Sequence, residues 1–265
     1  MPDQPFPPVD LHMHTWFSPC ATQESALSSV EAYAAEAVRL GLDTIAITDH
    51  FALPGPALPD WYDGLGPDII DQVARFAAGL SDGVTVLIGC EAEMLAPGRV
   101  TIDAAFARTL DLVILAASHL HFPEIGPPVG SPPTVVAAAL MDFFAAAVAI
   151  PYVDIVAHPF VIPHEPFGPP ASYLSLITDA DFRPLASIAA ANSIAFEING
   201  SMASQDDYRR LMPRFFHVAR EQGVKFSLGS DAHSVKDMAR LENARSFAVE
   251  LGLRRDDFIH PVRRV

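Results

Sequence analysis

Two histidines separated by one residue lie near the start of the chain, in the stretch Val9-Asp10-Leu11-His12-Met13-His14-Thr15. Residues two apart on an extended strand point to the same side, so the pattern predicts that both imidazoles bind one metal ion. Taken alone, the pattern fits two structural histidines equally well. The metal interpretation gains weight because seven of the ten histidines of the chain lie at the ends of short apolar runs.

Residue types that bind metals also end six further apolar runs. They are Asp49, His50, Glu91, Glu93, His119, His121, His158, Glu197, Asn199, Asp231 and His233. Histidines scattered through a core would not recur at one end of successive runs. Imidazoles combined with carboxylates suit Zn, Fe or Mn, and this many ligands exceeds the need of one four-coordinate ion. We therefore expect two or three divalent metal ions, which can activate water and stabilise an in-line displacement.

The apolar runs alternate with longer amphipathic segments. Strands are predicted at 9–15, 43–50, 84–94, 112–121, 154–160, 194–200 and 225–233. Helices are predicted at 24–41, 67–83, 101–110, 135–150, 182–192, 206–222 and 236–252. This alternation indicates an α/β fold with a parallel sheet and right-handed crossovers. A closed barrel is favoured over an open sheet, because the polar strand ends must converge. We expect one domain over residues 1–265, with its core at 9–252.

Three long segments rich in Pro and Gly follow predicted strands, at 51–66, 122–133 and 161–170. Loops of this length in a compact domain usually form the rim or the lid of a site. We therefore expect these loops to shape the pocket that selects the substrate.

The composition limits the partners and the compartment. The net charge of −15 argues against binding nucleic acid or an anionic membrane, so bound ions must attract any phosphorylated substrate. Two cysteines and an N-terminus without a signal-peptide pattern favour a cytoplasmic protein. The segment 134–153 is apolar enough to span a membrane, but Pro151 and the polar flanks favour a buried or interface helix.

The motifs that end these strands resemble those of the PHP family, the polymerase and histidinol phosphatase superfamily of metal-dependent phosphoesterases. In family order, they are Asp-Leu-His-Met-His-Thr, Ile-Ala-Ile-Thr-Asp-His, Gly-Cys-Glu-Ala, Ala-Ser-His, Val-Ala-His-Pro, Phe-Glu-Ile-Asn and Leu-Gly-Ser-Asp-Ala-His. They extend from residue 9 to residue 233, which is nearly the whole chain. The resemblance implies a distorted (β/α)₇ barrel of the TIM type, in agreement with the alternation of strands and helices.

The same resemblance implies a set of metal ligands. The ligands of the first ion would be His12, His14, Glu91 and Asp231. The ligands of the second ion would be Glu91, His119 and His158, so that Glu91 bridges the two ions. His50 and His233 would hold a third ion, and Cys20 stands where trinuclear members of the family have a further histidine. Either the Cys20 thiolate ligates the third ion, or the protein works with two ions.

Four residues are expected to take part directly in hydrolysis, namely Glu91, Asp231, His233 and His121. His164 is an alternative to His121 as a general acid or as a donor to the phosphate. Arg99, on the loop after the third predicted strand, is the candidate for binding the phosphate.

Further residues are expected to support the site. Asp49 should accept a hydrogen bond from a ligand imidazole, and Glu93 and Asn199 should do the same or touch the substrate. Glu197 lies between apolar neighbours and is expected to point outward to a helix.

We expect hydrolysis of a small phosphorylated metabolite, in which a metal-bridging hydroxide attacks phosphorus in line. Two alternatives stay open, namely a dedicated histidinol phosphatase and a phosphodiesterase for small nucleotides. An amidohydrolase is less favoured, because it needs a lysine on the fourth strand and Lys225 is the first lysine here. A proofreading nuclease and a non-catalytic metal-binding domain are also less favoured. A homo-oligomer is left open.

Overall fold

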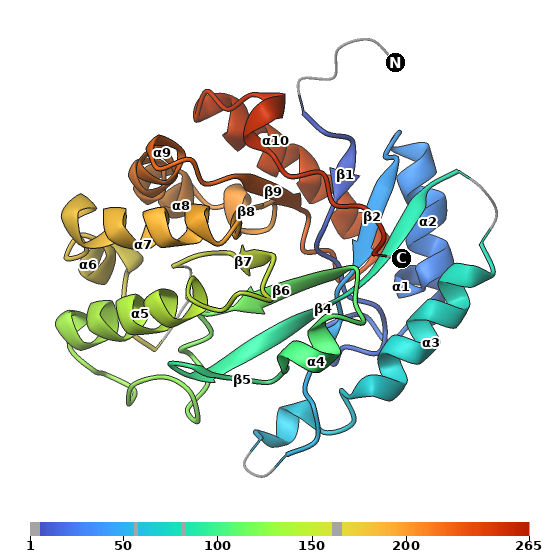
Figure 1. Cartoon of the computed structure of the whole chain (residues 1–265), viewed down its shortest axis with the longest axis horizontal. Coiled ribbons are helices and arrows are strands. Elements are labelled where there is room, and N and C mark those ends of the chain that lie inside the picture. The colour runs from blue at the N-terminus through green and yellow to red at the C-terminus, as the bar shows by residue number, and fades with distance from the viewer. Residues whose placement is uncertain (1–5, 56–57, 81–82, 161–165, 265) are drawn as a thin grey trace.

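The computed structural model describes residues 6–55, 58–80, 83–160 and 166–264. Its described residues contain a ring of parallel strands (Figure 1). In ring order these are β1 (Val9–Asp10), β2 (Thr44–Ile47), β4 (Thr85–Ala96), β6 (Leu112–Ala116), β7 (Ile155–Ala157), β8 (Ala195–Asn199) and β9 (Phe226–Gly229). The Leu11 amide donates to the Leu228 carbonyl at 2.9 Å and joins the two ends of the ring. The expected distorted (β/α)₇ barrel is thereby confirmed.

Helices surround the strands on the outside of the ring (Figure 1). The larger ones are α2 (Val30–Arg39), α3 (Pro67–Ala78), α5 (Pro133–Ala147), α7 (Asp179–Ala191), α9 (Pro213–Glu221) and α10 (Leu241–Glu250). Shorter ones are α1 (Ser25–Ser28), α4 (Ala104–Ala107), α6 (Pro170–Leu174) and α8 (Asp206–Leu211). Short 3₁₀ segments are η1 (Asp60–Tyr62), η2 (Met202–Ser204), η3 (Val235–Arg240) and η4 (Arg255–Asp257).

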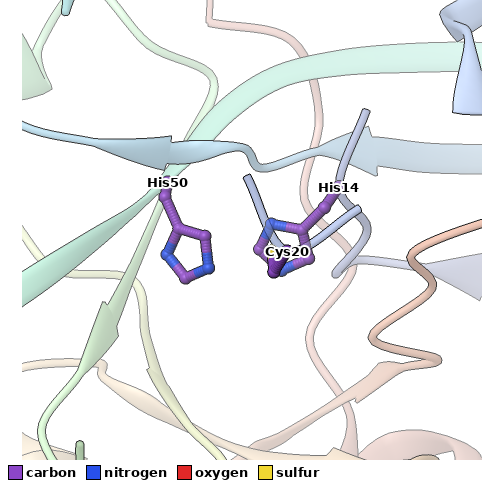
Figure 2. A group of neighbouring side chains, drawn as sticks. All are labelled: His14, Cys20 and His50. Carbon is purple, nitrogen blue, oxygen red and sulfur yellow. The ribbon is translucent and has the colours of Figure 1, made fainter. Parts of the chain in front are cut away.

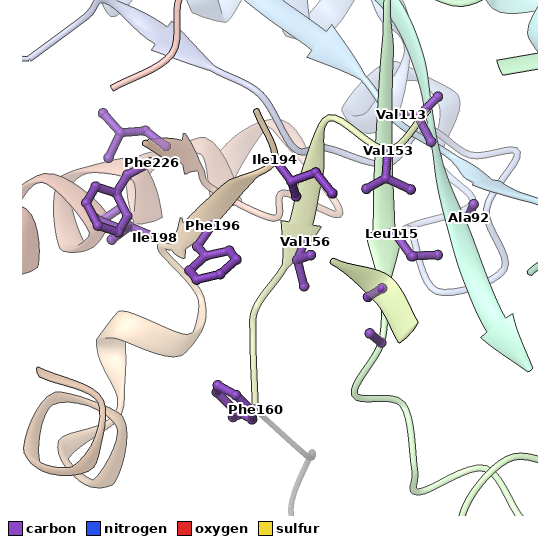
Figure 3. Close-up of a cluster of buried hydrophobic side chains, with 14 of the residues drawn as sticks. Ala92, Val113, Leu115, Val153, Val156, Phe160, Ile194, Phe196, Ile198 and Phe226 are labelled. Carbon is purple, nitrogen blue, oxygen red and sulfur yellow. The ribbon is translucent and has the colours of Figure 1, made fainter. Parts of the chain in front are cut away.

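Alternation along the strands divides the apolar side chains between two cores. On β8, Ala195 points into the ring, whereas Phe196 packs outward against the helices. Figure 3 shows Phe196 beside Val156 of β7 in this outer core. The inner core is small and consists mainly of Val, Leu, Ile and Ala side chains. The fully buried strands read as continuous apolar runs because both of their faces are covered.

Several predicted elements are shorter or divided in the structure. Helix 24–41 separates into α1 and α2 at Ser29, whose backbone is extended and whose side chain accepts the Ala32 amide. Helix 206–222 separates into α8 and α9 because Pro213, at the first turn of α9, cannot continue the preceding helix. Apart from β4, which continues to Ala96, the strands end earlier than predicted, since the chain leaves the ladder before most of the polar residues.

The strand β4 extends beyond its neighbours and turns into β5 (Arg99–Val100), which pairs with it antiparallel. The sequence analysis missed this hairpin, although Pro97 and Gly98 are typical turn residues. Gly98 has a φ of 78°, the conformation that glycine adopts without strain. The hairpin brings Thr101 back to Glu93, with the Thr101 amide 2.9 Å from the Glu93 carbonyl.

The apolar segment 134–153 forms α5, which has 15 residues and packs Val136, Leu140 and Phe144 into the outer core. Across the described parts of the chain, no helix combines the length and the apolar character needed to cross a membrane.

The C-terminal tail returns to the ring at the N-terminal ends of the strands. The Ile259 amide donates to the Phe226 carbonyl at 2.9 Å, and the Ile259 side chain packs against the inner core. Arg264 pairs with Asp154, which precedes β7. The tail therefore covers the end of the barrel opposite to the polar strand ends.

Candidate metal centre

Glu91, on β4, lies at the middle of a buried group of histidines. Its Oε2 is 3.5 Å from both His12 Nε2 and His14 Nε2. The same oxygen is 3.2 Å from His50 Nδ1, and Oε1 is 3.1 Å from His158 Nε2. These imidazoles follow β1, β2 and β7, so separate strand ends meet at one carboxylate.

The separations suit atoms that share a metal ion. Two ligand atoms bound tetrahedrally at about 2.1 Å lie about 3.4 Å apart. His12 Nε2 and His14 Nε2 are 3.1 Å apart, and His14 Nε2 is 3.4 Å from Asp231 Oδ1. An ion uses the lone pairs of both facing nitrogens, whereas a direct hydrogen bond uses only one. The donor set therefore fits a divalent cation.

Among the described residues, three groups bring potential ligand atoms within 4.8 Å of one another. They are His12, His14 and Asp231; Glu91, His119 and His158; and His14, Cys20 and His50. The first two groups contain residues expected at the first and the second ion. Figure 2 shows the third group, which combines Cys20 and His50 with His14, a residue that also belongs to the first group.

His233 stands beside these groups and is partly exposed. Its ring stacks on the His14 ring with the centroids 4.7 Å apart. Its Nδ1 lies 2.9 Å from the Asp231 carbonyl and donates to it, which leaves Nε2 free to bind an ion or substrate.

Glu197 overturns the expectation that it points outward. The side chain is 1% exposed, and its Oε1 accepts a hydrogen bond from His12 Nδ1 at 2.8 Å. Its Oε2 accepts the His158 amide at 2.7 Å. The apolar neighbours Phe196 and Ile198 occupy the outward positions of β8, so alternation turns Glu197 inward. Glu197 thereby fixes the His12 tautomer that presents Nε2 to Glu91.

Asp49 reaches the His14 imidazole through the Ser18 hydroxyl and not by a direct hydrogen bond. Its Oδ1 accepts the Ser18 hydroxyl at 2.6 Å, and Ser18 Oγ lies 3.4 Å from His14 Nδ1. The Thr15 amide and hydroxyl also donate to this carboxylate, at 2.8 and 2.7 Å. The Ser18 hydroxyl accepts the His50 amide at 3.1 Å. Asp49 therefore holds the loop after β1 in place, and Ser18 links that loop to two histidines.

Glu93 and Asn199 each contact a residue of the three groups. Glu93 Oε2 accepts from His119 Nδ1 at 2.6 Å. The Asn199 amide nitrogen lies 3.3 Å from Asp231 Oδ2 and 3.2 Å from Glu197 Oε2. Both residues thus orient side chains that face the centre.

The buried carboxylates and imidazoles shift one another's pKa values. Although burial opposes ionisation, the imidazoles of His50 and His12 hold the pKa of Glu91 well below its usual range. Burial disfavours a charge on His12, yet Glu197 and Glu91 raise the pKa of its imidazole well above the usual value. Burial lowers the pKa of His50 well below its usual value. The carboxylates that favour a proton on His12 also favour a metal cation between them.

Two of these residues have a backbone conformation that L-residues rarely adopt. The φ angles are 27° for His158 and 56° for Asp231. Such conformations cost about 1–3 kcal/mol each and are typical of functional sites. The Asp231 amide donates to the His12 carbonyl at 2.9 Å, and the His158 amide donates to Glu197. These bonds hold both side chains toward the centre.

The remaining predicted residues lie at the margin or elsewhere. The His121 ring is 5.4 Å from the His119 ring and 4.3 Å from Phe122. Burial, together with His119 and His158, lowers the pKa of His121 to about 4, so this imidazole is neutral at pH 7. Arg99 is exposed on β5 opposite Ala96. His164 lies outside the described residues.

Three residues that support the imidazoles from behind were not predicted from the sequence. Tyr62 donates to Glu93, Ser18 lies against His14, and Ser118 Oγ lies 3.3 Å from His158 Nδ1. Serine and tyrosine are too common for their positions to mark a site. Glu197 had a usable signal, because it is the acidic residue of β8 and lies between the apolar outward residues Phe196 and Ile198.

Comparison with known proteins gives a family match. Residues 10–159, more than half of the 265 residues, match the family model described as PHP domain. A probable phosphatase of Caldanaerobacter subterraneus subsp. tengcongensis is 29% identical over 243 residues, which cover 89% of this chain and 80% of that protein. The probable phosphatase YcdX of Escherichia coli O81 is 29% identical over 246 residues, which cover 89% and 82%.

A solved structure shares the fold. It is the histidinol phosphate phosphatase of Lactococcus lactis subsp. lactis, in complex with zinc, L-histidinol and phosphate. The TM-score is 0.64 at 16% identity, and the alignment covers 93% of this chain and 94% of that chain. At this identity, the likeness supports the barrel architecture.

The close packing behind His12 predicts that Gly229→Ala destabilises the chain. An added Cβ would lie 2.2 Å from Glu197 Oε1 and 2.7 Å from His12 Cβ. We expect the free energy of unfolding of metal-stripped protein, measured in urea, to fall by about 1–3 kcal/mol. Gly79→Ala is the control, because its added Cβ meets an atom no nearer than 3.4 Å. Equal stability of Gly229→Ala and the parent would contradict the packing described here.

Proposed function

This chain belongs to the PHP domain family, and we propose that this phosphatase hydrolyses a small phosphomonoester at a centre of two or three divalent metal ions. The observation that carries the proposal is the position of Glu91. Its two oxygens reach four imidazoles from three strand ends at 3.1–3.5 Å. A carboxylate placed in this way can bridge two ions.

We assign the ligands by the groups that the side chains form. The first ion would be bound by His12, His14 and Asp231, together with Glu91. The second ion would be bound by Glu91, His119 and His158. Zn, Fe and Mn all suit this mixture of imidazole and carboxylate.

When bound, such ions activate a water molecule for attack on phosphorus and neutralise charge on the phosphoryl oxygens. The residues of the chain hold the ligands in place, since Glu197 orients His12 and Asn199 contacts Asp231. His121 stands at the margin of the centre, where a ring N–H can donate to the phosphoryl or leaving oxygen. His233 also lies at the margin, where the lone pair of its Nε2 is available to an ion.

Cys20 is proposed as a ligand of a third ion, together with His50 and His233. Support comes from the group in which the Cys20 sulfur lies within 4.8 Å of nitrogens of His14 and His50. Cys20 is exposed as a residue, but desolvation of its thiol and the nearby Glu91 raise the pKa of that thiol, so a bound cation would favour the thiolate. A third site with this ligand would favour Zn or Fe over Mn.

The acidic composition favours a small substrate over a nucleic acid. With a net charge of −15, the chain repels polyanions, so attraction of the phosphate depends on the bound ions. A panel of phosphomonoesters and phosphodiesters, assayed with and without a chelator, would define the substrate class.

If Glu91 bridges two ions, its replacement should cause the loss of both bound metal and activity. We expect Glu91→Gln to lower the hydrolysis of p-nitrophenyl phosphate by more than about 100-fold, since replacing supporting residues alone costs 10–100-fold. Metal content, measured by plasma mass spectrometry, should fall in the same variant. Glu36→Gln is the control, because Glu36 pairs with Arg39 on the surface. Full activity of Glu91→Gln would remove this residue from the centre.

If Cys20 is a ligand of the third ion, its replacement should cause the loss of that ion alone. We expect Cys20→Ser to retain the first two ions and to lose about one equivalent, because a hydroxyl is a weaker ligand than a thiolate. The Co²⁺ form of the parent should show a thiolate-to-metal absorption band that Cys20→Ser lacks. Cys20→His should restore the third equivalent without the band. An unchanged band in Cys20→Ser would exclude Cys20 as a ligand.

A further inference from the structure

The short helix η1 reaches the metal centre from the loop between β3 (His50–Phe51) and α3. Tyr62 is 3% exposed, and its hydroxyl donates to Glu93 Oε2 at 2.7 Å. The same oxygen accepts from His119 Nδ1 at 2.6 Å. The Trp61 ring meets the His50 ring edge to face, with the centroids 4.6 Å apart. Two consecutive residues of η1 therefore act on two imidazoles of the centre.

The bond between Glu93 and His119 decides which nitrogen of His119 faces the ions. A proton on Nδ1 that is donated to a carboxylate leaves the lone pair of Nε2 available to a metal. Glu93 is 1% exposed, and its Oε1 has no hydrogen-bond partner within the described structure. Both donors thus meet at one oxygen, and the Tyr62 hydroxyl helps to fix the direction of that oxygen.

The loop that carries η1 is itself fixed to β4 and β5. The Thr101 hydroxyl donates to the Phe51 carbonyl at 2.7 Å and accepts the Glu93 amide at 2.8 Å. The Leu53 amide donates to the Thr101 carbonyl at 2.8 Å. Thr101 therefore ties the start of the loop to the backbone of Glu93.

We propose that Tyr62 is a positioning residue of the metal centre, which acts through Glu93 to hold His119 Nε2 toward the second ion. The proposal rests on the proposed function, since it takes His119 as a ligand. Burial and the neighbouring Glu93 raise the pKa of the Tyr62 hydroxyl, so it remains a donor at neutral pH.

The test is Tyr62→Phe in the full chain, which keeps the buried ring and removes only the hydroxyl. Protein stripped by a chelator is titrated with Zn²⁺ in competition with a chromogenic chelator. We expect one class of site to weaken by about 10–100-fold while the others keep their affinity. The visible spectrum of the Co²⁺ form should change as well, because the direction of the His119 ligand changes.

Two further variants complete the experiment. Glu93→Gln should weaken the same site, and the double variant should be less than additive, because both residues act on one imidazole. Tyr152→Phe is the matched control, since its hydroxyl donates to the Ile102 carbonyl away from the centre. If Tyr62→Phe does not fold, Glu93→Gln carries the test alone.

The outcomes separate this inference from the proposed function. If Tyr62→Phe keeps the Zn²⁺ affinity and the Co²⁺ spectrum of the parent, the positioning role is overturned and the metal centre stands. The same result in Glu93→Gln has this meaning where Tyr62→Phe does not fold. A parent chain that binds no Zn²⁺ would overturn the proposed function, and this inference with it.

Discussion

One buried carboxylate, Glu91, sets the requirements for the rest of the site. A negative charge that is 1% exposed must be compensated, and the compensation here is a shell of imidazoles at 3.1–3.5 Å. Neutral imidazoles compensate it weakly, whereas divalent ions between the same atoms would compensate it more strongly. The packing of so many ligand atoms around one carboxylate is therefore best explained by bound cations.

The barrel meets this requirement through geometry. Parallel strands that close into a ring deliver their C-terminal ends to one rim, so residues distant in sequence become neighbours. A second layer of acidic residues lies behind the imidazoles of the centre. Glu197 contacts His12, Glu93 contacts His119, and Asp49 reaches His14 through Ser18. This layer fixes ring orientation and tautomer, which the strand ends alone would leave variable.

The sequence predicted the barrel and the approximate strand positions, because βα alternation and apolar runs are local signals. It also predicted that His12, Glu91, His158 and Asp231 lie together, since each lies near the C-terminal end of a predicted strand. It failed for Glu197, where apolar neighbours suggested an outward position that alternation reverses. It failed for Tyr62 and Ser18, because their contacts are made between segments far apart in the sequence. The helix breaks at Ser29 and Pro213 were also not predicted. They arise from an N-cap serine and from a proline that cannot continue a helix, whereas the apolar periodicity continues across both positions.

The most direct test of the account is anomalous X-ray diffraction from crystals grown without chelator, recorded at the absorption edges of Zn, Fe and Mn. The account predicts at least two anomalous peaks, each about 2.0–2.2 Å from an oxygen of Glu91. One peak should lie beside His12 and His14, and the other beside His119 and His158. The absence of any peak within bonding distance of Glu91, in protein that hydrolyses a phosphomonoester, would contradict it.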